Sequence, residues 1–168
     1  LGDVYKRQVL VSHGSSTVPG YIVEEINALG GNIQNAHGIS IEELKAAIPC
    51  GIGKINVDTD IRLAVTRNMK EYFAQHPEKR NSPSIGGVYQ LLEEKREQFD
   101  PRAFLPPIMD TVMYGMVPDK DRAELVEVIE KGVKEAIGTL IVEFGSYGKA
   151  PLVEQVSLEE MAERYKRM

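Results

Sequence analysis

The sequence predicts an α/β fold with parallel strands. Two short apolar runs, VLVSHGSS at residues 9–16 and KINVDTD at residues 54–60, each end in small and polar residues. Such an end is typical of a parallel strand that brings reactive side chains to the rim of an α/β barrel. The intervening residues show helical spacing. A strand, helices, strand order of this length predicts a right-handed parallel crossover, which is the repeating unit of barrels and doubly wound sheets.

The elements of the first half follow from apolar spacing and from helix-ending residues. Gly30-Gly31 ends the first helical pattern, while Ser40 and Glu43 form a capping box for the second. Asp60 is expected to cap the third helix. We therefore expect, in order, a strand at residues 9–12, a helix over 22–29, a helix over 40–48, a strand at 54–57 and a helix over 60–76.

The second half reads as helical. Residues 77–98 are polar and are expected to contain a short helix around residues 89–98. We interpret this whole segment as an excursion on the barrel exterior or as an oligomer contact. Asp100-Pro101 is predicted to open a further helix that stops or kinks at Pro106-Pro107. A long amphipathic helix is expected over residues 123–141. A last helix is expected from Ser157, with Glu160 completing a capping box.

Composition excludes several classes of protein. The 168 residues are 42% hydrophobic and 27% charged, which suits one globular core and shows no signature of disorder. A net charge of -5 gives no basic footprint for nucleic acid, and no apolar run is long enough to span a membrane. We expect a cytoplasmic protein. The single cysteine, Cys50, is expected to be a buried small hydrophobe.

The first eight residues, LGDVYKRQ, are set apart. They carry three charged side chains before the strand, without the apolar central region of a signal peptide. We treat residues 1–8 as a non-native leader.

The residues after each strand are the candidates for chemistry. His13 is interpreted as a metal ligand, and Gly14, Ser15 and Ser16 as a phosphate cradle rich in amide and hydroxyl donors. Asn56, Asp58, Thr59 and Asp60 precede a helical pattern, where free amides favour an anion. Plainer interpretations exist: His13 could be a hydrogen-bonded structural residue, the glycine and serines a simple turn, and the aspartates helix caps.

Several of these motifs, in this order, resemble one enzyme family. HGSS, GGNIQNAHGISIEEL, GIGKINVDTDIRLA, FDPRAFL and the tail FGSYGKA with SLEEMAERY look like class II, metal-dependent fructose-bisphosphate aldolases of the longer, Calvin-cycle type. The resemblance implies a C-terminal fragment of that family. Residues 9–76 would be the last two strand and helix units of a TIM (β/α)8 barrel. Residues 77–168 would be the helical excursion and C-terminal helices of the same domain.

The resemblance implies reversible aldol cleavage of fructose 1,6-bisphosphate to dihydroxyacetone phosphate and glyceraldehyde 3-phosphate. A zinc ion held by three histidines would stabilise the enediolate, with His13 matching the third ligand. Asn56 matches the residue that hydrogen-bonds the enediolate. The triose-phosphate cradle is matched by Gly14, Ser16, Asp58 and Thr59, beside a monovalent cation, Na⁺ or K⁺. Asp58 is expected to accept from a hydroxyl or to orient donors, since it cannot pair with an anion. Arg102, in the DPR motif, matches the ligand of the far phosphate.

The other two histidine ligands and the proton-moving aspartate have no match in this sequence. We therefore expect an active homo-oligomer only as part of a longer chain, and no turnover from these 168 residues alone. Two alternatives stay open. One is a tagatose-bisphosphate or sedoheptulose-bisphosphate aldolase with the same cradle. The other is an inactive assembly module or pseudoenzyme subunit.

Overall fold

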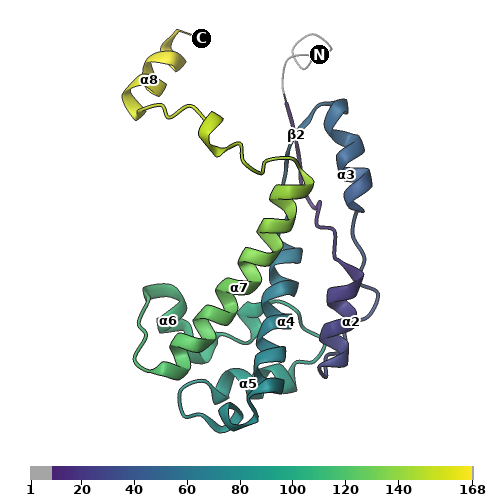
Figure 1. Ribbon diagram of the computed structural model, residues 1–168, viewed down its shortest axis with the longest axis vertical. Coiled ribbons are helices and arrows are strands. Elements are labelled where there is room, and N and C mark those ends of the chain that lie inside the picture. The colour runs from purple at the N-terminus through teal and green to yellow at the C-terminus, as the bar shows by residue number, and fades with distance from the viewer. Residues whose placement is uncertain (1–8, 168) are drawn as a thin grey trace.

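The computed structural model describes residues 9–167, so the predicted leader at residues 1–8 lies outside the described residues. The chain forms a mostly helical α/β structure with a small parallel sheet (Figure 1). Its strands and α-helices are β1 (Leu10–Ser12), α2 (Gly20–Ala28), α3 (Ile41–Ala47), β2 (Ile52–Ile55), α4 (Thr59–Gln75), α5 (Gly86–Glu94), α6 (Met109–Tyr114), α7 (Lys120–Glu143) and α8 (Leu158–Lys166). No helix within residues 9–167 combines the length and the apolar character that a membrane span requires.

The sheet consists of the two predicted strands, paired in parallel. Leu10 lies opposite Ile52 and Ser12 opposite Ile55, with an irregularity in register after Leu10. The pairing continues one step further, because the Asn56 amide donates to the Ser12 carbonyl at 3.0 Å. The predicted parallel crossover is therefore confirmed. Within the described residues these strands pair only with each other, and the side chain of Val11 remains 48% exposed.

Two helices connect the strands, as predicted. α2 buries Ile22 and Ile26 against Leu63 of α4 in a small apolar cluster. α3 begins with the predicted capping box, since Ser40 Oγ accepts from the Glu43 amide and the Ser40 amide donates to Glu43 Oε2. The prediction for Cys50 is wrong. It lies in a 3-10 turn, Ile48–Cys50, at the end of α3, and its side chain is exposed because no element of the described chain covers that turn.

The main core lies between α4, α5 and α7 at the end of the molecule away from the sheet (Figure 1). α4 and α7 run side by side, and α5 closes the core below them. The buried side chains of this core are Val65, Met69, Tyr72, Phe73, Ile85, Val88, Leu92, Phe104, Leu105, Ile108 and Leu125. Residues 77–98, expected as an exterior excursion, thus contribute Ile85, Val88 and Leu92 to the main core.

Three predicted helix starts differ in detail. α4 begins one residue after Asp58, so Asp60 is inside the first turn and is not the cap. Asp100 is an N-cap as predicted, because its side chain accepts from the Arg102 amide, but Pro101–Ala103 forms only a 3-10 turn. The next two prolines, at 106 and 107, prevent a longer helix. At α8, Ser157 accepts from the Glu160 amide as expected, but the Glu160 side chain pairs with Arg164, so the predicted capping box is only half formed in the described chain.

The long predicted helix is α7, and its apolar side is buried only in part. Leu125 is fully buried, with Val128, Ile129 and Val133 packed on the main core. Ile137 and Ile141, nearer the C-terminal end, are each 40% exposed. A 3-10 turn, Ala150–Leu152, follows, and α8 then lies apart from the other helices with no buried residue (Figure 1).

Candidate active site

The two strand ends bring His13 and Asn56 into contact. β1 ends at Ser12 and β2 at Ile55. Because the strands are parallel and these two residues lie opposite each other, the residues that follow them meet at the same edge. Asn56 Nδ2 lies 3.0 Å from His13 Nδ1 across 43 residues of sequence. The ring of His13 is exposed, so its other face is open to a ligand. The two residues singled out for the reactive centre are therefore neighbours.

The predicted cradle residues surround a hollow beside this pair. It has a volume of about 490 Å³ and is lined by His13, Gly14, Ser16, Ile55, Asn56, Val57, Asp58 and Thr59. Gly14 takes a left-handed backbone, with φ at +66°, and a side chain there would be strained whatever the space around it. The structure thus gathers six of the seven predicted site residues around one hollow.

Ser16 ties the first strand end to the start of α4. Its Oγ accepts from the amides of Asp58 at 3.2 Å and Thr59 at 3.0 Å. These two amides were expected to donate directly to an anion, but in the structure they donate to the Ser16 hydroxyl oxygen. The Ser16 hydroxyl keeps one proton that it can still donate. Ser15, by contrast, is fully buried and contacts Ser12 Oγ.

Contacts with Asp60 and Gly38 fix the position of the cradle loop that follows β1. The buried Asp60 carboxylate accepts from the Thr17 amide at 3.1 Å, the Thr17 hydroxyl at 2.7 Å and the Val18 amide at 2.8 Å. These bonds stabilise Val18, a non-glycine residue with φ at +50°. On the other side, a Cβ at Gly38 would lie 2.2 Å from the Ser16 carbonyl oxygen, so only glycine allows this contact.

Arg102 does not line the hollow. Its side chain is 71% exposed, and its Nε donates to both carboxylate oxygens of Asp100 at 3.0 Å. The Arg102 guanidinium, with Arg62, holds the pKa of the Asp100 carboxyl below its usual range. Asp100 also accepts from Arg62 Nη1 at 2.8 Å, and Arg62 Nε donates to Asp58 Oδ1 at 2.9 Å. Arg102 is thereby linked to the hollow through Asp100, Arg62 and Asp58.

The donor set present does not complete a metal site. Zinc in a catalytic site takes three protein ligands plus a water or substrate. Among residues 9–167, no three histidine, cysteine or acidic side chains are placed to hold a metal ion. Among the residues that line the hollow, His13 is the one histidine. Rotation of the Asn56 amide would let its oxygen accept from Nδ1–H and leave Nε2 free to bind a metal.

The sequence did not identify Arg62 or Gly38 as site residues. It predicted that Asp60 caps α4, whereas the Asp60 carboxylate binds Thr17 and Val18. The partners of Asp60 lie 42 and 43 residues away, and Arg62 reaches Asp100 across 38 residues. The repeated acids of the DTD motif, with an arginine four residues after Asp58, were the available signal for the Arg62 pair. For Gly38, the HG dipeptide before the capping box predicts a turn but not the close contact with the Ser16 carbonyl.

Known proteins match this chain over most of its length. The sequence profile of class II fructose-bisphosphate aldolases matches residues 2–149, which includes part of the predicted leader, so that prediction stays untested. A fructose-bisphosphate aldolase of Xanthobacter flavus is 33% identical over 93% of this chain and 33% of its own length. That of Giardia intestinalis is 34% identical over 94% and 36%, and that of Thermus caldophilus is 40% identical over 61% and 28%.

This chain therefore spans about a third of the length of the curated relatives that it matches. The match covers both strand ends, the hollow and the DPR motif. The chain belongs to the class II fructose-bisphosphate aldolase family.

Proposed function

We propose that this chain forms the triose-phosphate side of an active site for reversible cleavage of fructose 1,6-bisphosphate. The products would be dihydroxyacetone phosphate and glyceraldehyde 3-phosphate. The observation that carries the proposal is the pair of strand ends, which joins His13 and Asn56 beside the hollow lined by Gly14, Ser16 and Thr59. The relatives of Xanthobacter flavus and Giardia intestinalis bear the name fructose-bisphosphate aldolase.

In this proposal β1 and β2 with their helices, residues 9–76, are the last two units of a TIM barrel. Residues 77–168 complete the same domain as helices. The exposed apolar strand β1 supports this arrangement, because barrel strands are paired on both edges and buried on both faces. The further strands, and the remaining metal ligands, would come from residues outside this sequence.

Each side chain has a proposed role that fits its position. The Asn56 amide would donate to the oxygen that gains negative charge when the carbon-carbon bond breaks. The Ser16 hydroxyl and the Gly14 backbone would bind the triose phosphate, with Asp58 and Thr59 holding that loop. His13 would be one ligand of a zinc ion that the described residues do not complete.

Arg102 is proposed to bind the far phosphate. Its guanidinium is exposed and uses one edge for Asp100, so its other N–H groups remain available for an anion.

A graft tests the proposal. Residues 9–168 would replace the homologous part of the Xanthobacter flavus relative, and cleavage of fructose 1,6-bisphosphate would be measured. We expect a zinc-containing, active graft, in which His13→Ala lowers bound zinc. Arg102→Ala should lower kcat/KM by roughly 10- to 150-fold, the effect of losing a charged hydrogen bond.

Arg96→Ala is the matched control. Arg96 is an exposed arginine that pairs with Glu93, as Arg102 pairs with Asp100, and its side chain is 57% exposed. It should leave cleavage unchanged. A folded graft that binds zinc but does not cleave the sugar would contradict the proposed function.

A further inference from the structure

Arg62 occupies an unusual position between two segments of the site. It extends from the first turns of α4, where its Nε donates to Asp58 Oδ1 at 2.9 Å. Its Nη1 donates to Asp100 Oδ2 at 2.8 Å, and Asp100 lies 38 residues further along the chain. The side chains of Arg62 and Asp100 are only 28% and 22% exposed, so solvent screens this ion pair less than the pair with Asp58, whose side chain is 67% exposed.

Each carboxylate that Arg62 binds belongs to one end of the proposed substrate site. Asp58 lines the hollow, and its backbone amide is bound by Ser16. Asp100 holds Arg102 through both the side chain and the backbone, since it accepts from Arg102 Nε and from the Arg102 amide. The contacts therefore form one continuous series from Ser16 through Asp58, Arg62 and Asp100 to Arg102.

Arg62 also changes the charge available at Arg102. If Asp100 paired with Arg102 alone, one carboxylate would neutralise one guanidinium. Here Asp100 Oδ2 is shared by two guanidinium groups. A shared carboxylate compensates each cation only in part, so Arg102 keeps more of its positive charge for an anionic ligand.

We propose that Arg62 is a positioning residue that couples the triose-phosphate hollow to Arg102. It acts through Asp100, fixing the direction of the Arg102 guanidinium and preserving its charge. This inference rests on the proposed function for its substrate, a sugar with a phosphate at each end. The contact network itself is independent of the reaction.

The kinetic test uses the graft that carries Arg62→Met. Methionine is similar in length to arginine but lacks the guanidinium group that binds both Asp58 and Asp100. Fructose 1,6-bisphosphate and fructose 1-phosphate are compared, because the second lacks the far phosphate. We expect kcat/KM for the bisphosphate to fall by about tenfold or more, and for the monophosphate by less than about threefold. In an Arg102→Ala background, Arg62→Met should add less than about twofold, because both changes remove the same contact.

Arg67→Met is the matched control, since Arg67 lies on the same helix and pairs with Glu135 of α7, away from Asp100. It should leave the preference for the bisphosphate unchanged. Arg62→Lys should not restore that preference, because one ammonium cannot reproduce the two-sided fork. An equal loss for both sugars, or effects of Arg62 and Arg102 that multiply, would overturn the inference and leave Arg62 a structural residue only.

A second measurement separates this inference from the proposed function. Hydrogen exchange of residues 99–105 is followed in the 168-residue chain, without substrate or metal. Arg62→Met should speed exchange at the Arg102 amide by about tenfold, whereas Arg67→Met should not. An inactive graft with this exchange difference would refute the proposed reaction but retain the coupling. Unchanged exchange would refute the coupling whatever the graft does.

Discussion

The helical end and the strand end of this chain differ in how well each buries its own apolar side chains. At the helical end, Phe73, Phe104 and Leu125 are at most 1% exposed. At the strand end, Val9 is 67% and Leu10 50% exposed. The first region forms a core from its own residues, whereas the second presents an apolar strand with an unpaired edge. Apart from Arg102, the residues proposed for chemistry follow the strands, so they belong to the region that depends most on neighbours.

The comparison predicts very different costs for the same substitution. Leu92→Ala removes a fully packed side chain from the helical core and should lower the free energy of unfolding by about 2–5 kcal/mol. Leu10→Ala removes a half-exposed one from β1 and should cost about 0.5 kcal/mol or less. Denaturant unfolding followed by circular dichroism measures both. Equal losses would mean that the strand end is as well packed as the helices.

A backbone contact at the strand end gives a sharper test. Gly38→Ala would place a Cβ 2.2 Å from the Ser16 carbonyl oxygen and force the cradle loop to move. We expect a cost of about 1–3 kcal/mol and weaker substrate binding in the graft. Gly138→Ala in α7 is the control, because a Cβ there meets no atom within 4 Å. It should stabilise the helix by up to about 1 kcal/mol. A normal KM in the Gly38 variant would show that the cradle tolerates the shift.

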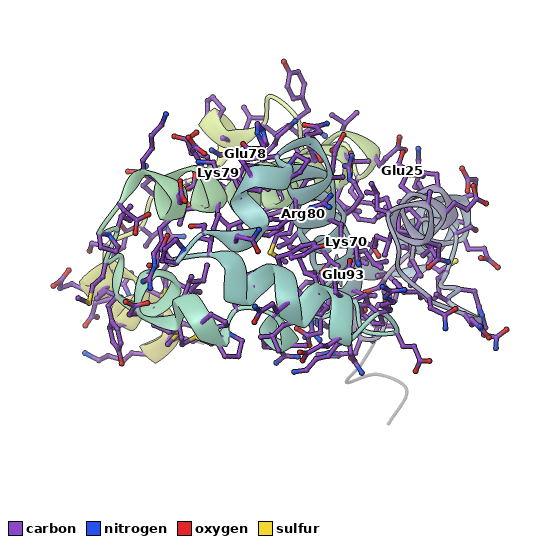
Figure 2. The ribbon with its side chains drawn as sticks, turned by 90° about the horizontal axis from the view of Figure 1, so that it is seen from below. Glu25, Lys70, Glu78, Lys79, Arg80 and Glu93 are labelled. Atoms are coloured by element: carbon purple, nitrogen blue, oxygen red, sulfur yellow. The ribbon has the colours of Figure 1, made fainter. Side chains whose placement is uncertain are left out.

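The buried side chain of Lys70 is expected to lower the stability of the helical core. It lies on α4 beside Glu93 (Figure 2), is 4% exposed, and among residues 9–167 donates only to the Leu92 carbonyl, at 3.3 Å. Burial lowers the pKa of the Lys70 amine; the charge of Glu93 raises it in part, and Arg96 lowers it further. Because the unfolded chain binds this proton more tightly, stability should increase as the pH rises from the lowered value toward 10.5.

Lys70→Met should remove that dependence and raise the free energy of unfolding at neutral pH by about 1 kcal/mol. The gain over the unsubstituted chain should shrink as the pH rises toward 10.5 and disappear above it, where the amine is neutral in both states. Lys134→Met, at a side chain 76% exposed on α7, is the control and should show neither effect. A destabilised Lys70→Met protein would mean that the Leu92 contact outweighs the burial of charge.

Local patterns predicted much of this structure. The Ser40 capping box, the Asp100 N-cap and the long helix α7 follow from residues within a few positions of one another. The parallel pair follows from the order of strand, helices and strand, and the meeting of His13 and Asn56 from the rule that parallel strands end at one edge. A sequence displays local spacing and the order of elements directly.

Contacts between distant segments were beyond the sequence. Asp60 carries a cap signal, yet its carboxylate serves a loop 42 residues earlier, because the fold brings Val18 against the first turn of α4. Cys50 was expected to be buried, but burial depends on which elements cover a turn. Nothing in the local sequence encodes these partners.

We propose that this chain carries one side of a metal-dependent aldolase site and acts only together with residues outside this sequence. Cleavage of fructose 1,6-bisphosphate by the purified 168-residue chain, with zinc supplied, tests this most directly, with the graft as the active reference. One histidine cannot hold a catalytic zinc, so we expect no turnover from the chain and clear turnover from the graft. Measurable cleavage by the chain alone would contradict the proposal that it needs residues outside this sequence.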